Sequence, residues 1–223
     1  MRREKHIVAI DGPAGSGKST VARLAAEKLG FLYLDTGAMY RAATWRAMRD
    51  GIDFEDREAL ARSAAGMDLF FKGGSIFVDG RDVTGEIRSR EVTNNVYRLA
   101  DVQVVRDAMV AQQRKLGARG GIVAEGRDTG TIVFPGAEIK IYLDASVAER
   151  ALRRHRELEK KGIDAPVEEI EREITERDWR DRNRKIAPLK AAEGAVVLDT
   201  TDMTVEEVVS AVAEITAGLP EEK

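Results

Sequence analysis

A glycine-rich segment near the start of the chain contains residue types that together bind phosphate. The pattern G-x-x-x-x-G-K-[ST] is matched by Gly12-Pro13-Ala14-Gly15-Ser16-Gly17-Lys18-Ser19, and Thr20 follows it. Glycines allow successive backbone N–H groups to converge on phosphate oxygens, and the N-terminus of a helix adds partial positive charge. Lys18 can reach the outer phosphates of a nucleoside triphosphate, and the Ser19 hydroxyl can join the coordination shell of Mg²⁺. We expect this whole segment to bind the nucleotide.

The flanking sequence favours this interpretation over a chance glycine-rich turn. A strand is expected over residues 6–11 and a helix over residues 18–29, so the segment connects a strand to a helix, as the motif requires. The chain has no N-K-x-D sequence, the motif by which guanine-specific proteins usually recognise the base, and it is too short for a large ATPase machine. The rest of the chain should therefore bind a small phosphoryl acceptor.

Thr36 and Arg41 follow a second predicted strand at residues 31–35. At this spacing the Thr36 hydroxyl would cap a helix, and the Arg41 guanidinium would lie about one and a half turns into it. A planar guanidinium can bind two phosphate oxygens at once, so Arg41 suits the phosphate of an acceptor. The alternative is an ordinary helix cap followed by a surface arginine.

A charged turn, Glu125-Gly126-Arg127-Asp128, follows a third predicted strand at residues 121–125. Its glycine permits a sharp turn that directs Arg127 and Asp128 toward the ligand-binding edge of an α/β sheet. One cation and two carboxylates there can hold phosphate, a nucleobase or hydrated Mg²⁺. Asp35 and Glu125 are candidates for contacting the metal ion through water. The alternative is a turn held by salt bridges.

Arginines are concentrated between residues 177 and 185. On a helix, Arg177, Asp181 and Arg184 share one face, with Arg180 beside Arg184. Arginine matches phosphate oxygens better than lysine does, and phosphoryl transfer depends on charge stabilisation and the exclusion of water. We therefore expect a lid that closes over the transferring phosphate. A solvated charged helix and an RNA-contacting helix are the alternatives.

A second basic set precedes this segment on a predicted helix. It consists of Arg150, Arg153 and Arg154, and it suits the donor nucleotide. We expect Arg153 and Arg154 to bind ATP.

Short apolar runs alternate with helical stretches along the chain. Five of these runs are predicted strands: residues 6–11, 31–35, 121–125, 139–144 and 195–199. Together they predict an α/β protein with a P-loop NTPase fold, in which helices flank a central five-stranded parallel sheet. Each strand ends in an acid, which either lines the ligand-binding edge or caps the element that follows. These acids are Asp11, Asp35, Glu125, Asp144 and Asp199.

Residues 67–86 differ from the rest, because short β-like runs alternate there with turns. Lys72-Gly73-Gly74 and Asp79-Gly80 supply those turns, which predicts a small antiparallel insert. A long helix is expected to follow over residues 90–116.

Composition excludes several classes of protein. The 223 residues are 43% hydrophobic and 34% charged, with a net charge of −3, no cysteine and two histidines. Disulfides, thiolate catalysis and Cys–zinc sites are therefore excluded. No apolar run is long enough for a membrane span or a signal peptide. We expect a cytoplasmic protein, monomeric, with no nucleic-acid or membrane partner.

The chain resembles the bacterial cytidylate kinases (CMP/dCMP kinases) along nearly its whole length. The matching segments are I-D-G-P-A-G-S-G-K-S-T, L-D-T-G-A-M-Y-R, G-E-I-R-S-R-E-V, E-G-R-D-T-G-T-I-V-F-P and R-D-W-R-D-R-N-R-K-I-A-P-L. The resemblance implies Mg²⁺-dependent transfer of the γ-phosphoryl group of ATP to CMP or dCMP. It also implies a core of residues 1–36, 119–150 and 186–223, a nucleoside-monophosphate-binding region of residues 37–118, and an arginine-rich lid of residues 151–185.

The resemblance further implies roles for individual residues. Catalysis would fall to Lys18, Arg127, Asp128, Arg177 and Arg184, and the acceptor would be bound by Thr36, Arg41, Arg106, Arg127, Asp128, Arg177, Asp181 and Arg184. Among these, Arg41, Arg127 and Arg184 would hold the acceptor phosphate, Asp128 and Arg106 the cytosine, and Arg177 and Asp181 the ribose. Tyr97 stands where we align a small hydroxyl residue near the base.

Two other functions compete with this one. A different small-molecule kinase, acting on shikimate or dephospho-coenzyme A, would leave the insert and Asp128 without an obvious purpose. A non-catalytic nucleotide- or RNA-binding module would use the arginine helix, and its RNA binding would depend strongly on salt.

Overall fold

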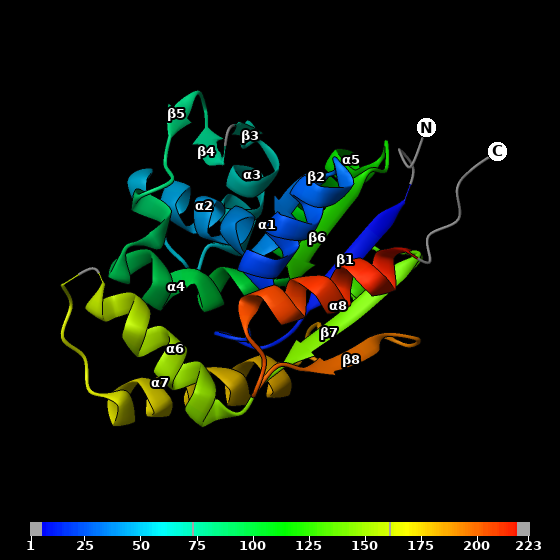
Figure 1. Cartoon of the computed structure of the whole chain (residues 1–223). Helices are drawn as coiled ribbons and strands as arrows, with labels where there is room; N and C mark the ends of the chain where they lie inside the picture. The colour runs from blue at the N-terminus through cyan, green and yellow to red at the C-terminus, as the bar shows by residue number, and fades with distance from the viewer. Residues whose placement is uncertain (1–5, 73, 161, 218–223) are drawn as a thin grey trace. The chain divides into compact units, whose positions relative to one another are not determined.

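The structure is a computed structural model, and it describes residues 6–72, 74–160 and 162–217. The chain divides into two units (Figure 1). The first comprises the described residues of 1–34 and 119–223, and the second is residues 35–118. The segment expected to act as a lid, residues 151–185, belongs to the first unit.

A five-stranded sheet forms the centre of the first unit and confirms the predicted fold class. Its strand order is β2-β6-β1-β7-β8. The strands are β1 (Ile7–Asp11), β2 (Leu32–Asp35), β6 (Ile122–Gly126), β7 (Ile139–Asp144) and β8 (Val196–Asp199). β1 pairs in parallel with both β6 and β7, and β7 pairs in parallel with β8. The central strand β1 is apolar and buried over Val8–Ile10, as expected of a strand covered on both faces.

Two helices cover one face of this sheet. Helices α1 (Lys18–Leu29) and α8 (Val205–Ala217) lie side by side against it in Figure 1. Their apolar residues, including Val21, Val208 and Val212, pack with the buried residues of β1, β6 and β7. Each such side chain contributes roughly 1.5–3 kcal/mol when fully buried. The core therefore fixes the strand ends from which the functional loops emerge.

Helices α6 (Val147–Glu159) and α7 (Val167–Asn183) form a second, smaller cluster in the first unit. Ala151 of α6 packs with Ile170 and Ile174 of α7. The C-terminal half of α7 carries the arginine cluster.

The second unit combines helices with a three-stranded antiparallel sheet, which confirms the predicted insert. Its elements are α2 (Thr36–Arg49), α3 (Arg57–Ala65), β3 (Leu69–Lys72), β4 (Ser75–Val78), β5 (Arg81–Asp82), η1 (Glu86–Arg88), α4 (Arg90–Ala100) and α5 (Gln103–Gly117). Asp79 and Gly80 both have positive φ, 51° and 78°, as a tight two-residue hairpin turn requires. Gly73, expected in the other turn, lies outside the described residues.

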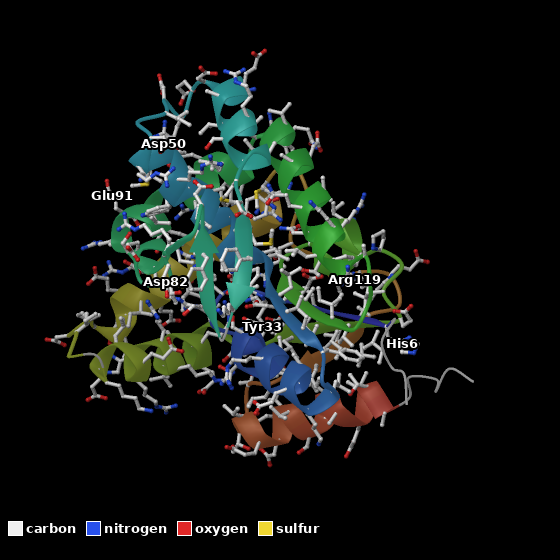
Figure 2. The ribbon with its side chains drawn as sticks, turned by 90° about the horizontal axis from the view of Figure 1, so that it is seen from above. His6, Tyr33, Asp50, Asp82, Glu91 and Arg119 are labelled. Carbon is white, nitrogen blue, oxygen red and sulfur yellow. The ribbon has the colours of Figure 1, made fainter. Side chains whose placement is uncertain are left out.

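Acidic side chains stabilise the turns of the second unit. Asp79 forms ion pairs with Arg46 and Arg49 of α2, which tie the β4–β5 hairpin to that helix. Figure 2 shows Asp50 beyond the end of α2 and Asp82 on β5. Asp50 binds Arg49 next to it.

The predicted helix over residues 90–116 is wrong, because the chain breaks there into α4 and α5. Asp101 ends α4, and Val102 is extended, with φ −99° and ψ 114°. Arg106 donates to the carbonyl of Ala100 at 3.2 Å, so a side chain satisfies one of the terminal carbonyls of α4. In the part of the chain that is described, no helix is long and apolar enough to cross a membrane.

Candidate active site

The phosphate-binding segment connects β1 to α1, as predicted. Gly17 is the N-cap of α1 and has φ 84°, a left-handed conformation that favours glycine. Gly12 lies close to the end of β7, because a Cβ at this position would be 2.1 Å from the carbonyl oxygen of Leu143. Gly15 is exposed, also with positive φ. These glycines let the backbone turn tightly between strand and helix.

Lys18 and Ser19 follow this turn at the start of α1. The Lys18 side chain is buried, and its Nζ donates to the carbonyl of Pro13 at 2.9 Å. The ammonium therefore lies against the phosphate-binding segment itself. Ser19 and Thr20 are exposed on the first turn. A hard hydroxyl oxygen beside a phosphate-binding backbone fits Mg²⁺, which prefers oxygen ligands and keeps several waters.

The turn after β6 begins at the same edge of the sheet, since Asp11 and Gly126 are partners in the parallel register. It continues into one turn of π-helix over Thr129–Val133, which the sequence did not predict. The Asp11 carboxylate accepts the N–H groups of Thr129 and Gly130 at 2.8 and 2.7 Å. Burial raises the pKa of Asp11 above its ordinary value, although these two N–H groups stabilise its charged form. Asp11 thus holds the turn that carries Arg127 and Asp128.

Arg127 is paired with the C-terminal half of α7. Its Nε donates to Asp181 Oδ2 at 2.8 Å, and both side chains are largely buried. Burial opposes the charge of each group, but the two charges stabilise one another. As a result the pKa of Arg127 is raised and that of Asp181 is lowered. The charge of Arg177 contributes to lowering the Asp181 pKa, which places Arg177 near this pair.

Asp128 lies near Arg184, the last arginine of the cluster. Its Oδ1 is 3.6 Å from Arg184 Nη2, and each side chain is 9% exposed. Arg184 also donates to the carbonyl of Ala187. The sequence predicted Arg184 inside the helix, but α7 ends at Asn183 and Arg184 has extended backbone angles. Even so, the structure brings Arg127, Asp128, Asp181 and Arg184 together.

The second basic set is divided among different partners. Arg150 is 1% exposed and donates to the carbonyls of Ala14 and Ala145 and to the Asp178 carboxylate. Arg153 binds Glu149 and Thr200. Arg154 binds Glu157 at 2.9 Å and is exposed. Binding of ATP by Arg153 and Arg154 stays a prediction.

The second unit contains the remaining predicted acceptor ligands. Asp35, and not Thr36, caps α2, because its Oδ1 accepts the N–H of Ala38 at 2.7 Å. Thr36 is the first residue of the helix and is buried. Arg41 donates to the hydroxyl of Thr93 on α4 at 2.8 Å. The hydrogen bond fixes the direction of the Arg41 guanidinium.

Arg106 is 2% exposed and lies in the same unit. Its guanidinium carbon is 5.5 Å from the centre of the Tyr40 ring, a cation–π distance. Tyr97 is 45% exposed on α4. The structure therefore holds Arg106 in place, while Tyr97 is partly exposed to solvent.

Comparison with known proteins identifies the family. The model of the family described as "Cytidylate kinase" matches residues 8–217. The chain belongs to the cytidylate kinase family. A cytidylate kinase of Lactiplantibacillus plantarum is 47% identical over 219 residues, covering 96% of each chain. One from Ligilactobacillus salivarius is 49% identical over 212 residues, covering 93% of this chain and 95% of the other.

Similar sequences also occur as part of longer proteins. A "Bifunctional pantoate ligase/cytidylate kinase" of Trichodesmium erythraeum is 48% identical over 219 residues, which are 96% of this chain and 42% of that protein. Among solved structures, a crystal structure from Thermus thermophilus has a TM-score of 0.52 at 19% identity, covering 98% of this chain and 100% of that one. This likeness supports the α/β fold alone.

The acids that end the predicted strands of this cytidylate kinase family member form different hydrogen bonds. Asp144 and Asp199 accept backbone N–H groups of the turns that follow them, at 2.9 Å in each case. Asp144 is not the cap of α6, because Ser146 takes that place, whereas Asp35 does cap α2. Glu125 is buried and accepts the hydroxyl of Tyr33 at 3.0 Å. Figure 2 shows Tyr33 on β2. Asp11 supports the turn after β6, a role that depends on a contact between residues 118 positions apart and had no local signal.

Proposed function

We propose that the chain transfers the γ-phosphoryl group of ATP to CMP or dCMP, giving ADP and CDP or dCDP. It is an ATP-dependent nucleoside-monophosphate kinase. The observation that carries the proposal is the joint presence of a phosphate-binding segment with Lys18 and a buried group of two arginines and two aspartates, in a chain of the cytidylate kinase family.

Donor binding is assigned to the segment from Gly12 to Thr20. Its backbone N–H groups would bind the phosphates of ATP, and Lys18 would exchange the carbonyl of Pro13 for a phosphate oxygen. An ammonium held 2.9 Å from a neutral carbonyl gains a stronger, charge-assisted partner in this exchange. Arg153 and Arg154 are assigned to the rest of the nucleotide.

Acceptor binding is assigned by charge and position. Arg41, Arg127 and Arg184 would hold the phosphate of CMP, since guanidinium groups match its oxygens. Arg106 and Asp128 are assigned to cytosine. Arg177 and Asp181 are assigned to the ribose, with Thr36 as a further acceptor contact.

These residues would act through positioning and electrostatics. Phosphoryl transfer places negative charge on the transferring group, and arginines already held in place stabilise that charge with little reorganisation. Asp181 and Asp128 keep the guanidinium groups of Arg127 and Arg184 in place before substrate arrives. The monophosphate therefore meets an oriented site.

Mg²⁺ is part of the proposal. Ser19 would hold it directly, and Asp35 or Glu125 would contact it through water. Bound there with ATP, the ion would neutralise charge on the phosphates. Among the described residues, no group of three or more His, Cys, Asp or Glu side chains is placed to hold a metal ion. The monomeric state, the cytoplasmic location and the absence of a nucleic-acid or membrane partner stay predictions.

The test is formation of ADP from ATP and Mg²⁺ with CMP, dCMP, UMP, AMP or shikimate offered separately. We expect turnover with CMP and dCMP and little with UMP. Comparable turnover with UMP would support the kinase activity but contradict the assignment of Arg106 and Asp128 to cytosine. Tyr97 would then be the next residue to test. Turnover with shikimate alone, or with no acceptor, would overturn the proposal.

A further inference from the structure

Arg150 on α6 is among the largest fully buried side chains described in this protein, at 1% exposure. Its guanidinium contacts three separate segments. Nε donates to the carbonyl of Ala145 at 2.9 Å, at the start of the loop that leads into α6. Nη1 donates to the carbonyl of Ala14 in the phosphate-binding segment, also at 2.9 Å. Nη2 donates to Asp178 of α7 at 2.6 Å.

The contact with Ala14 determines the direction of a neighbouring N–H group. A trans peptide unit is planar, so its C=O and N–H point in opposite directions. The peptide that contains the Ala14 carbonyl also contains the N–H of Gly15. With the carbonyl held toward buried Arg150, the Gly15 N–H points to the other side, and Gly15 is exposed. This exposed side is where a phosphate would bind.

The packing around Gly15 reinforces the same arrangement. A Cβ at Gly15 would lie 3.2 Å from the Cβ of Arg150, so the loop and α6 are already in close approach. Gly15 has φ 79°, a conformation that only glycine adopts readily. The aliphatic part of the Arg150 side chain therefore packs against the loop backbone at Gly15, and its guanidinium binds the loop at Ala14.

Asp178 connects this support to the arginine cluster. Its side chain is 4% exposed, and Asp178 lies three residues before Asp181 on the same helix. Asp181 binds Arg127 on the turn after β6. Helix α7 thus contacts the phosphate-binding loop through Arg150 and the predicted acceptor residues through Arg127.

We propose that Arg150 is a positioning residue for the donor phosphates. It orients the peptide between Ala14 and Gly15 and links that peptide to α7 through Asp178. Arg150 contacts no nucleotide itself. The inference rests on the proposed function, because it assumes that the loop from Gly12 to Thr20 binds ATP.

The decisive variant is the double substitution Arg150→Met with Asp178→Leu. Replacing both partners of a buried ion pair by apolar residues of similar volume is often neutral for stability, whereas replacing one leaves a buried charge unpaired. We expect the double variant to fold, but to unfold at a lower temperature than the wild type, because the carbonyls of Ala14 and Ala145 lose this donor. Its Kd for MgATP, measured by calorimetry without acceptor, should rise about 10- to 100-fold, since one oriented phosphate contact is lost.

Kinetics of the double variant separate positioning from a general loss of structure. KM for ATP should rise, while KM for CMP should stay within about twofold of the wild type. Arg156→Met is the matched control, because Arg156 lies on the same helix and is 62% exposed. It should change neither constant. If the stable double variant binds MgATP like the wild type, Arg150 serves stability only and the proposal is wrong.

A second variant decides the question if the double variant fails to fold. Arg150→Lys keeps a charge opposite Asp178, but one ammonium cannot bridge acceptors on three segments. We expect a folded protein with a raised Kd for MgATP, and an unchanged Kd would overturn the proposal. Because MgATP binding is measured without acceptor, a wild type that binds MgATP but fails to phosphorylate CMP would contradict the proposed function alone.

Discussion

Two loops of the first unit are assigned to phosphate in the proposed function, and they are built in opposite ways. The loop after β1 relies on its backbone: its three glycines, Gly12, Gly15 and Gly17, have positive φ, and its N–H groups are the proposed binding elements. The turn after β6 relies on side chains, those of Arg127 and Asp128. These are held by Asp181 and Arg184, which lie 54 and 56 positions away in the sequence. One loop is encoded locally and the other by distant contacts.

The difference assigns a separate task to each loop. A backbone cradle is generic, since any polyphosphate offers the same oxygens to the same N–H groups. Side chains held by ion pairs are specific, since their position depends on particular partners. We therefore expect changes in the first loop to affect the donor and changes in the second to affect the acceptor.

The largest expected effect is that of Lys18→Ala. This change removes the one side-chain cation of the first loop, which lies 2.9 Å from the Pro13 carbonyl. We expect kcat to fall at least about 1,000-fold, which corresponds to roughly 4 kcal/mol of transition-state stabilisation. ADP formation with CMP measures the loss, and circular dichroism checks the fold. Lys28→Ala, an exposed lysine on the same helix, is the control. Retained turnover in Lys18→Ala would show that the loop is not the donor site.

Arg127→Met tests the second loop. We expect kcat/KM for CMP to fall about 100- to 1,000-fold, because a preorganised cation is removed from the charge that develops in transfer. The Kd for MgATP should stay close to the wild-type value, since the backbone cradle is intact. Arg119→Met, an exposed arginine shortly before β6, is the control. An equal loss of MgATP binding would mean that the two loops do not act separately.

The same contrast explains which features could be predicted from the sequence. The β1 loop, the strand boundaries to within one residue and the hairpin at Asp79-Gly80 follow from local residue types, so they were predictable. The break between α4 and α5 was not predicted; there Asp101 ends α4, and the Arg106 side chain donates to the carbonyl of Ala100. Nor were the contacts of Asp11 and Arg150, which join segments 118 or more positions apart. Sequence patterns predicted which charged residues belong to the candidate site, but the residues with which they pair are determined by tertiary packing.

Gly12→Ala tests the packing of the first loop without changing any charge. A Cβ at Gly12 would lie 2.1 Å from the Leu143 carbonyl oxygen, so the loop or the end of β7 must move. We expect a loss of about 2–3 kcal/mol in the free energy of unfolding. Gly17→Ala is the matched control: its φ is also positive, but a Cβ there meets nothing within 4 Å. That change should cost only about 1 kcal/mol, from backbone strain. Equal losses in urea unfolding would show that φ, and not close packing, dictates glycine at both positions.

The smallest expected effect, and the one most sensitive to pH, is that of Asp181→Asn on stability. Because Arg127 lowers the pKa of Asp181 in the folded state, the charged carboxylate binds more favourably there than in the unfolded chain. Its contribution is fully present above the unfolded pKa of about 3.9 and is lost as pH falls through the lowered folded value.

Asp181→Asn should therefore reduce the free energy of unfolding by about 1.5–3 kcal/mol at pH 7, the range for a hydrogen bond to a charged group. The difference between wild type and variant should shrink as pH falls below about 4, because the wild type then loses the same charge. Urea unfolding of both proteins from pH 7 down to pH 3 measures this convergence. If the gap is the same at all pH values, the Asp181 carboxylate stabilises the turn by its shape and not by its charge. The second loop, like the first, would then be held by packing and hydrogen bonds and not by an ion pair.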